Sequence, residues 1–365
     1  MATLAALAAA AAAATLLAQT PVWKDAAPGR AIVLPADHAS HPDYRIEWWY
    51  YTGNLDAPDG GRFGYQLTFF RVGVDPAPTN ASRWAVRDVF MTHLALTDVG
   101  GRRFRFVDRL NRAGPGWAGA ATDAYRVWNE QWRAALEPGG VHRLAAATKD
   151  FGIDLRLDEN RPAVLHGDRG YSRKGTSPGN ASYYYSLTRM PTRGTITIDG
   201  RIVDVAGESW MDHEFGTTFL EADQVGWDWF SLQLDDGREL MIYRLRRPDG
   251  SADARSSGTL VEPDGSYKHI SIDSGFVLAP GRTWTSSASG GRYPVEWHLR
   301  LPREAIDLDV VAAIDDQELR MGLSTGVTYW EGAIDVRGTV KGRPARGRGY
   351  LEMTGYAGRG LEALR

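Results

Sequence analysis

The sequence predicts an all-β protein built from two antiparallel β-barrel domains that pack together, with few and short helices. Three observations lead to this prediction. The 365 residues exceed the usual size of one hydrophobic core, so two domains of ordinary size are expected. Most of the chain consists of short β-like runs, several of them alternating between apolar and polar residues, separated by turn signals. A Trp-rich pattern in the first half also recurs in the second half.

The first twenty residues resemble an export leader. Met1 to Ala18 are Ala, Leu and Thr almost throughout, and a polar Gln19-Thr20-Pro21 follows. This pattern is typical of the apolar region of a signal peptide, although the positively charged start of such a peptide is missing. An Ala-rich helix without an export role is the alternative. We therefore expect an exported protein of the periplasm or cell envelope, with residues 21–44 forming an extended arm.

Residues 45–200 are predicted to form the N-terminal barrel. In the run from Tyr65 to Phe69, the side chains of Tyr65, Leu67 and Phe69 share one face, as in a half-buried antiparallel strand. The preceding turn, Pro58-Asp59-Gly60-Gly61, is a hairpin signal because glycine accepts the positive φ that such turns require. The strands expected in this half are Glu47–Asn54, Gly64–Val72, Val89–Thr97, Phe104–Val107, Ala134–Leu136, Ile153–Leu157, Ser182–Leu187 and Thr195–Ile198.

Residues 201–365 are predicted to form the C-terminal barrel. The run Trp48-Trp49-Tyr50-Tyr51 leads into a hairpin turn and a second strand, and Trp227-Asp228-Trp229-Phe230 does the same. An Asp-His pair precedes each run, Asp37-His38 in the first half and Asp212-His213 in the second. An internal duplication accounts for both parallels and for the length of the chain. We place the boundary between the halves near Arg201.

Charge and composition exclude several classes of protein. The formal net charge is −3, and Lys and Arg are scattered among Asp and Glu, so the basic stripe of a nucleic-acid binder is missing. Without cysteine the chain has no disulfide, thiolate catalyst or sulfur-based metal site. His93, His213 and Glu214 lack the spacing of a zinc motif, and there is no phosphate loop or Gly-x-Ser-x-Gly elbow. We expect no nucleic-acid partner, no metal and no cofactor.

Aromatic residues, at 11% of the chain with 13 Trp, predict an apolar binding cavity. A closed barrel of antiparallel strands can hold one small ligand, so a hydrophobic small molecule or lipid is the expected partner. A Trp-rich core without a ligand is the alternative. The residues predicted to contact the ligand are Trp48, Trp49, Tyr50, Trp210, Trp227, Trp229, Tyr329 and Trp330.

The densest polar cluster lies in the segment from Glu208 to Gly216, where Asp212, His213 and Glu214 stand side by side amid Trp, Met and Phe. An apolar pocket disfavours the charged form of a carboxyl, so Asp212 or Glu214 could keep a proton near neutral pH and serve as an acid. If the segment is a strand, both carboxyls point to one face and His213 to the other. A solvated surface loop is the alternative.

His93 and Glu331 complete the set of candidate catalytic residues. His93 stands alone in an apolar, strand-like run, where a hydrogen-bonded core histidine is the more frequent outcome. Glu331 follows two large aromatic residues and could act in the site or simply pair with an Arg.

Taken in order, these segments resemble the AttH-like and carotenoid 1,2-hydratase family. The matching segments span almost everything after the leader: Glu47–Gly53, Met91–Ala95, Gly207–Gly216, Trp227–Phe230, Tyr329–Gly332 and Gly349–Tyr356. The resemblance implies two lipocalin-like barrels. In the hydratase members of the family, water adds to a carbon–carbon double bond at the end of an isoprenoid chain, and an aspartate in the region of Asp212 looks like the proton donor.

Such a reaction passes through a carbocation, so the site needs a neutral carboxylic acid, aromatic faces and one water. The resemblance gives the first role to Asp212. Our hypothesis assigns the aromatic faces to Trp49, Trp229 and Trp330, and the placing of water to His93, His213 or Glu331. Two further hypotheses remain open. One is a non-catalytic envelope carrier of a lipophilic molecule, working beside a transport system. The other is a secreted hydrolase, as members of the AttH-like branch are often described. The oligomeric state is not predicted.

Overall fold

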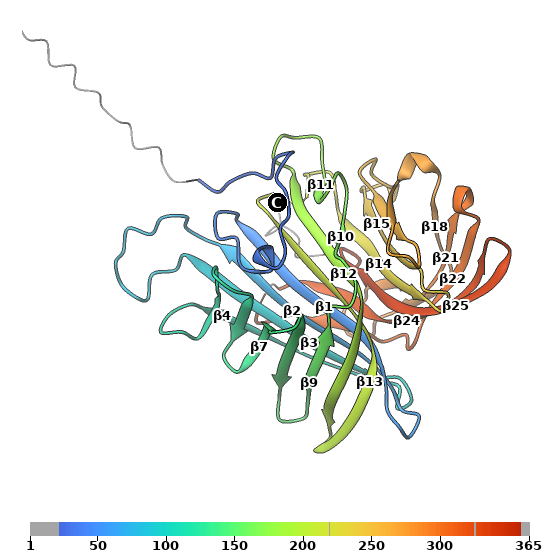
Figure 1. Ribbon diagram of the computed structural model, residues 1–365, viewed down its shortest axis with the longest axis horizontal. Helices are drawn as coiled ribbons and strands as arrows, with labels where there is room; N and C mark the ends of the chain where they lie inside the picture. The colour runs from blue at the N-terminus through green and yellow to red at the C-terminus, as the bar shows by residue number, and fades with distance from the viewer. Residues whose placement is uncertain (1–21, 219, 325, 359–365) are drawn as a thin grey trace, which may run out of the picture.

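The computed structural model describes residues 22–218, 220–324 and 326–358, and nearly all of its regular structure is antiparallel β-strand (Figure 1). The helices in this part of the chain are three short 3₁₀ turns, η1 (Ala36–His38), η2 (Ile272–Ser274) and η3 (Pro302–Glu304). None of the described helices is long and apolar enough to span a membrane. The leader predicted for residues 1–20 lies outside the described residues.

The first sheet contains thirteen strands and curls into a barrel. Its last strands approach its first, since β4 contacts β5 and β6. In order across the sheet the strands are β4 (Arg103–Arg112), β3 (Asp88–Asp98), β2 (Arg62–Gly73), β1 (Ile46–Asp56), β13 (Arg201–Gly216), β12 (Ala181–Ile198), β9 (Phe151–Asp158), β8 (Val141–Ala147), β7 (Trp132–Glu137), β6 (Arg126–Asn129) and β5 (Ala118–Ala120), with β10 (Val164–Leu165) and β11 (Tyr171–Arg173) also paired to β12. Each strand predicted for the first half lies within one of these.

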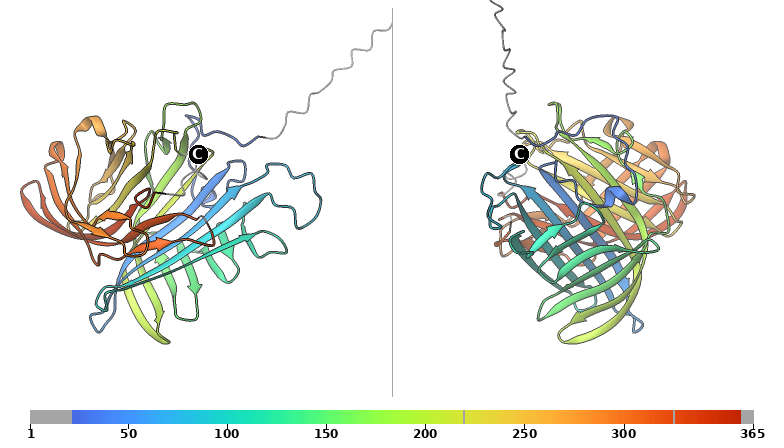
Figure 2. Two further views of the ribbon diagram at one scale, coloured as in Figure 1. Left: turned by 180° about the vertical axis from the view of Figure 1, so that it is seen from behind. Right: turned by 60° about the vertical axis from the view of Figure 1, so that its left-hand side comes forward.

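The second sheet contains ten strands and curls in the same way (Figure 2). Its order is β17 (Tyr267–Ser271), β16 (Ser257–Val261), β15 (Glu239–Arg246), β14 (Gly226–Leu234), β25 (Arg343–Met353), β24 (Thr328–Val340), β22 (Ile306–Ala312), β21 (Glu296–Leu301) and β18 (Val277–Pro280), with β23 (Glu318–Arg320) also paired to β24. A small separate sheet joins β19 (Thr283–Thr285) and β20 (Arg292–Pro294). The prediction of an all-β fold with two barrel-like halves is confirmed.

The two sheets divide between β13 and β14, later in the chain than the boundary near Arg201. Strand β13 pairs with both β1 and β12, so the first sheet continues to Gly216. Residues Asp199 and Gly200, with φ of 51° and 75°, form a tight turn that joins β12 to β13 as a hairpin. The turn signal at this position therefore marks a hairpin and not a domain boundary.

Both sheets repeat one strand order. The series β4-β3-β2-β1-β13-β12-β9-β8 has the same connectivity as β17-β16-β15-β14-β25-β24-β22-β21. The two Trp-rich runs begin equivalent hairpins, β1–β2 and β14–β15. Their turns contain Gly60 and Gly237 at φ of 87° and 88°, a conformation that glycine adopts without steric cost. This equivalence supports an internal duplication.

The barrels pack through the central strands of each sheet. Strand β1 contacts β25, β2 contacts β24 and β12 contacts β14. One apolar cluster fills each barrel, and a third lies between them, built on Tyr50, Trp210, Trp229, Tyr243 and Tyr350. The central strands are consequently buried on both faces, one toward the barrel interior and one toward the partner barrel.

Candidate functional site

A cavity of about 120 Å³ lies between the two barrels, bounded by side chains of both sheets. Most of its wall is aromatic or aliphatic, and four carboxyl groups and one ammonium group interrupt it. The lining residues are Trp48, Tyr50, Gln66, Phe70, Lys174, Tyr184, Asp212, Glu214, Leu220, Trp227, Trp229, Tyr243, Leu245, Glu331 and Glu352. Concave apolar surface with a few convergent polar groups is typical of a small-molecule site.

The duplication places two of these carboxyls at equivalent positions. Asp212 on β13 stands opposite Tyr50 on β1, and Glu352 on β25 stands opposite Trp229 on β14. Tyr50 and Trp229 occupy the same place in their respective Trp-rich runs, two residues after the first Trp. Each barrel thus contributes an acid from the same strand of the repeat, and the two acids share one cavity.

Asp212 is almost completely buried and accepts three hydrogen bonds. Tyr184 donates to Oδ2 at 2.7 Å, Trp210 Nε1 donates to Oδ1 at 2.6 Å, and the Ser186 hydroxyl also donates to Oδ1. Burial raises the pKa of Asp212 from 3.8 to about 7, the charge of Glu214 adds to this rise, and the three hydrogen bonds oppose it. A substantial fraction of Asp212 is therefore a neutral acid near pH 7.

Glu214 is the carboxyl that has a cationic partner. Lys174 Nζ lies 2.9 Å from Glu214 Oε1, and the Ser182 hydroxyl donates to the same oxygen. Burial alone would lower the pKa of Lys174, but Glu214 and Tyr243 outweigh it and hold this pKa above its usual value. Lys174 therefore keeps its charge beside Glu214, and this contact uses the one cationic side chain among the residues that line the cavity.

The other two carboxyls, Glu331 and Glu352, resemble Asp212 in lacking a cation. Burial raises the pKa of Glu352 to about 7, helped by the charges of Asp212 and Glu214 and opposed by a hydrogen bond from Trp227 Nε1 at 3.0 Å. Burial, with the charge of Glu352, raises the pKa of Glu331 well above 4.5. Within the described ranges, Asp212, Glu331 and Glu352 form no ion pair, so the cavity holds three carboxyls that favour the protonated form.

Three polar atoms of the cavity wall make no hydrogen bond of ordinary geometry within the described chain. They are the hydroxyl oxygen of Tyr50, Oε1 of Gln66 and Oε1 of Glu331. A buried polar atom left without a partner costs free energy, so native proteins usually satisfy such atoms with water or a ligand. These atoms mark the place where a polar group or a water molecule would be held.

A buried histidine is hydrogen-bonded behind Asp212. His166 Nε2 lies 2.6 Å from Ser186 Oγ, and its Nδ1 lies 2.8 Å from Thr259 Oγ1. Because the Ser186 hydroxyl donates to Asp212, its oxygen is free to accept from His166. A continuous chain of hydrogen bonds therefore leads to the acid, from Thr259 through His166 and Ser186 to Asp212.

The structure brings together most of the residues predicted from the sequence. Asp212, Glu214 and Glu331 all reach the cavity, as do four of the predicted aromatic contacts, Trp48, Tyr50, Trp227 and Trp229. Trp210 lies directly behind the cavity wall, where its indole N–H donates a hydrogen bond to Asp212. His93 and Tyr329 also lie behind the wall: Nδ1 of His93 is 2.8 Å from the Tyr329 hydroxyl, and the imidazole ring packs 5.0 Å from the ring of the lining residue Phe70.

Three predicted residues point away from the cavity. His213 faces the interior of the first barrel, opposite to Asp212 and Glu214, because successive side chains of a strand alternate between faces. Trp49 lies in the core of the first barrel and Trp330 in the core of the second. These residues therefore cannot place water or form a wall of the cavity, and Trp48 and Tyr50 take the positions expected of Trp49.

Four residues at the site were not predicted from the sequence: Glu352, Lys174, Tyr184 and His166. Glu352 could have been found by extending the repeat, since it occupies the position of Asp212 in the second half. Tyr184 lies in a predicted strand among Tyr183 and Tyr185, whose faces the sequence does not distinguish. Lys174 and His166 lie in irregular segments around short strands and carry no sequence signal.

Residues 25–356 match the AttH-like family. A crystal structure of a protein from Nitrosomonas europaea that carries the AttH designation superposes with a TM-score of 0.83 at 34% sequence identity, covering 91% of this chain and 99% of that one. The structure of kievitone hydratase from Nectria haematococca gives a TM-score of 0.69 at 14% identity, covering 92% and 96%. In sequence, kievitone hydratase from Fusarium solani subsp. phaseoli is 22% identical over 215 residues, which is 58% of this chain and 59% of that enzyme.

Proposed function

The chain belongs to the AttH-like family, and from this premise we propose that it adds water to a carbon–carbon double bond of an apolar, isoprenoid- or lipid-like molecule, with Asp212 as the acid. The observation that carries the proposal is the set of three buried carboxyls, Asp212, Glu331 and Glu352, without a cationic partner in a cavity walled by aromatic rings. An isolated alkene has no polar group to bind or polarise, so catalysis of its hydration depends on a desolvated carboxylic acid that still holds its proton near neutral pH.

In the proposed reaction the carboxylic acid of Asp212 transfers its proton to one alkene carbon, and the π electrons form the new C–H bond. The neighbouring carbon becomes a carbocation, which the ring faces of Tyr50, Trp227 and Trp229 stabilise. A water molecule adds to this carbon and then loses a proton, which restores the acid. The path through Ser186 and His166 supplies a second route for returning that proton.

The unpartnered atoms of Tyr50, Gln66 and Glu331 supply the binding site for this water. Each lies in the cavity wall, and together they offer acceptors that would orient the water's hydrogens while its oxygen faces the cation.

Cavity size restricts the part of the substrate that is enclosed. A volume of about 120 Å³ is well below the roughly 300–1,000 Å³ of sites that enclose a drug-sized ligand. We therefore propose that the cavity takes the alkene-bearing end of a longer molecule. The name of kievitone hydratase, a relative in sequence and in fold, agrees with water addition as the reaction class.

The test is a mass measurement on the intact protein with candidate ligands. Purified protein is incubated with isoprenoid and fatty-acyl extracts, and the bound and released molecules are weighed by native mass spectrometry. We expect release of a product heavier by one water, and a loss of turnover of about 10²- to 10⁴-fold in Asp212→Asn. Asp59→Asn, in an exposed turn, is the matched control and should keep full activity.

The two alternatives predict other outcomes of the same measurement. A ligand retained and released at unchanged mass, with the same affinity in wild type and Asp212→Asn, would favour the carrier. Cleavage of an ester or amide ligand by wild type would favour the hydrolase.

A further inference from the structure

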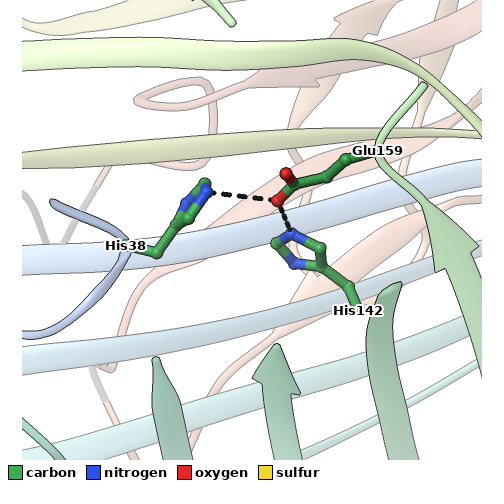
Figure 3. Close-up of side chains that lie close together, drawn as sticks. All are labelled: His38, His142 and Glu159. Carbon is green, nitrogen blue, oxygen red and sulfur yellow. Dashed lines mark hydrogen bonds and ion pairs between the residues drawn. The ribbon is translucent and has the colours of Figure 1, made fainter. Parts of the chain in front are cut away.

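A second group of buried polar side chains lies inside the first barrel (Figure 3). His38 comes from η1 in the N-terminal arm, His142 from β8, and Glu159 directly follows β9. Both imidazole rings direct Nε2 at one carboxylate oxygen: His38 Nε2 lies 3.1 Å from Glu159 Oε1, and His142 Nε2 contacts the same oxygen. Both histidine side chains have no exposed surface.

The hydrogen bonds of the barrel interior allow His38 the tautomer that binds a metal through Nε2. Its Nδ1 lies 2.7 Å from the Tyr185 hydroxyl, which also lies 3.0 Å from His213 Nδ1 and 3.2 Å from the carbonyl oxygen of Asp37. The single hydroxyl hydrogen of Tyr185 can go to His38 Nδ1, to His213 Nδ1 or to the carbonyl. When it goes to His213 or to the carbonyl, the hydroxyl oxygen accepts from His38 Nδ1–H, and His38 Nε2 then carries a lone pair that can bind a metal.

In this tautomer two acceptors, His38 Nε2 and Glu159 Oε1, face each other. His38 Nε2 and Glu159 Oε1 are 3.1 Å apart, yet His38 Nε2 makes no hydrogen bond within the described structure. Two electron-rich atoms this close in a dry interior repel each other unless a cation lies between them.

We propose that His38, His142 and Glu159 bind one divalent transition-metal ion, and that Zn²⁺ fits this donor set. Two nitrogens and one carboxylate oxygen are ordinary zinc ligands, with bond lengths of about 2.0–2.2 Å. Two such ligands on one ion are roughly 3 Å apart at bond angles of about 90–110°, which agrees with the 3.1 Å separation of His38 Nε2 and Glu159 Oε1.

The surroundings of the group support a metal. Histidine ligands usually have the second ring nitrogen held by another residue, which fixes the orientation of the ring. Tyr185 holds Nδ1 of His38, and Tyr51 holds Nδ1 of His142 at 2.8 Å. The Glu159 side chain is 21% exposed, so an ion can enter past it.

A neighbouring group, His41, Glu47 and His213, has similar residue types but is already neutralised. Arg71 Nε lies 3.1 Å from Glu47 Oε2, and His41 bridges Glu47 and Asp37 at 2.9 and 3.0 Å. Burial opposes the positive charge of His41, but the two carboxylates outweigh it and raise its pKa. Protons and Arg71 therefore occupy the positions that a metal would need, and the inference concerns the His38 group alone.

Metal binding would fasten the N-terminal arm to the barrel, because His38 belongs to the arm whereas His142 and Glu159 belong to the sheet. The test uses the full chain, freed of metal by a chelator and titrated calorimetrically with ZnCl₂ at pH 7.5. We expect one equivalent of Zn²⁺ to bind and to raise the midpoint of thermal unfolding. His142→Gln and Glu159→Gln should each weaken binding by about 100-fold or more, since changes behind the ligands already cost about 10- to 100-fold.

Two variants serve as controls. His269→Ala removes an exposed histidine, and His41→Gln disrupts the neighbouring group; both should keep the zinc affinity. A wild type that binds no Zn²⁺ overturns the proposal, as does binding that His41→Gln removes and Glu159→Gln leaves intact. X-ray absorption of the wild-type zinc complex decides independently of any variant: two imidazole ligands support the proposal, and a shell of oxygen ligands alone overturns it.

Discussion

Replacing the proposed acid should make the folded protein more stable at alkaline pH, although it should lower turnover. Burial raises the pKa of Asp212 from 3.8 to about 7. Each pKa unit corresponds to about 1.4 kcal/mol, so ionising this carboxyl in the folded protein costs about 4 kcal/mol more than in the unfolded chain. Asp212→Asn has nearly the same shape and no charge, and it removes this cost.

The sign of the pH dependence follows from the direction of the shift. The folded state holds the Asp212 proton more tightly than the unfolded state, so the contribution of Asp212 to stability falls as pH rises above 3.8 and stops changing above about 7. Between pH 5 and pH 7 this loss is at first about 1.4 kcal/mol per pH unit and becomes smaller as pH approaches 7, so it sums to about 2 kcal/mol. Over that range the free energy of unfolding of wild type should fall by about 2 kcal/mol more than that of Asp212→Asn.

The assay is urea unfolding of both proteins at pH 5, 6, 7 and 8, with Asp59→Asn as the control for an exposed aspartate. Glu352 and Glu331 also titrate with raised pKa, so the wild-type slope alone is not diagnostic. The difference between the two proteins reports Asp212 together with its effect on Glu352, whose pKa the charge of Asp212 helps to raise. A difference that stays constant within about 1 kcal/mol from pH 5 to pH 8 would refute the reasoning, because Asp212 would then ionise as freely as in the unfolded chain.

Three further predictions concern the neighbours of the acid. Lys174→Met should lower the free energy of unfolding by about 3–5 kcal/mol in urea at pH 7, because Glu214 loses its buried partner; Lys24→Met, from an exposed ion pair, should cost no more than about 1 kcal/mol. Trp229→Leu should weaken ligand binding about tenfold in a Kd measurement, since it removes a wall of the cavity and keeps every carboxyl. Ser186→Ala removes a hydrogen bond that lowers the pKa of Asp212, so the decline of activity with rising pH should move to higher pH, and an unshifted profile would contradict this role.

Much of the fold was predictable because local patterns and tertiary structure agree in the first sheet. The alternation from Tyr65 to Phe69 lies in β2, with those apolar side chains in the core of the first barrel. Period-two alternation also separated Asp212 and Glu214 from His213 before their surroundings were known. These predictions depend only on strand geometry, which neighbouring residues determine.

Which face of each central strand points to the cavity, and which to the barrel interior, was not predictable. The packing of the two barrels buries both faces of these strands. In β13 the side chains from Trp210 to Phe215 are all buried, so hydrophobicity does not distinguish the barrel interior from the cavity. For the same reason Trp49 and Trp330 looked as suitable for the cavity as Trp48. An isolated β-sandwich or barrel with one solvated face would have resolved this choice by its polar residues.

The acid site depends on both barrels at once. Trp229 of the second barrel donates its indole N–H to the hydroxyl of Tyr184 at 3.0 Å, so that hydroxyl has its own hydrogen left to donate to Asp212 of the first barrel at 2.7 Å. The Tyr50 ring meets the Trp229 ring edge-on at 5.2 Å and closes the cavity at the equivalent position of the repeat. Burial, which raises the pKa of Asp212 and of Glu352, therefore comes from the packing of one barrel on the other. A single barrel of this kind would leave its carboxyl in water and ionised, so duplication supplies what makes the carboxyl an acid near neutral pH.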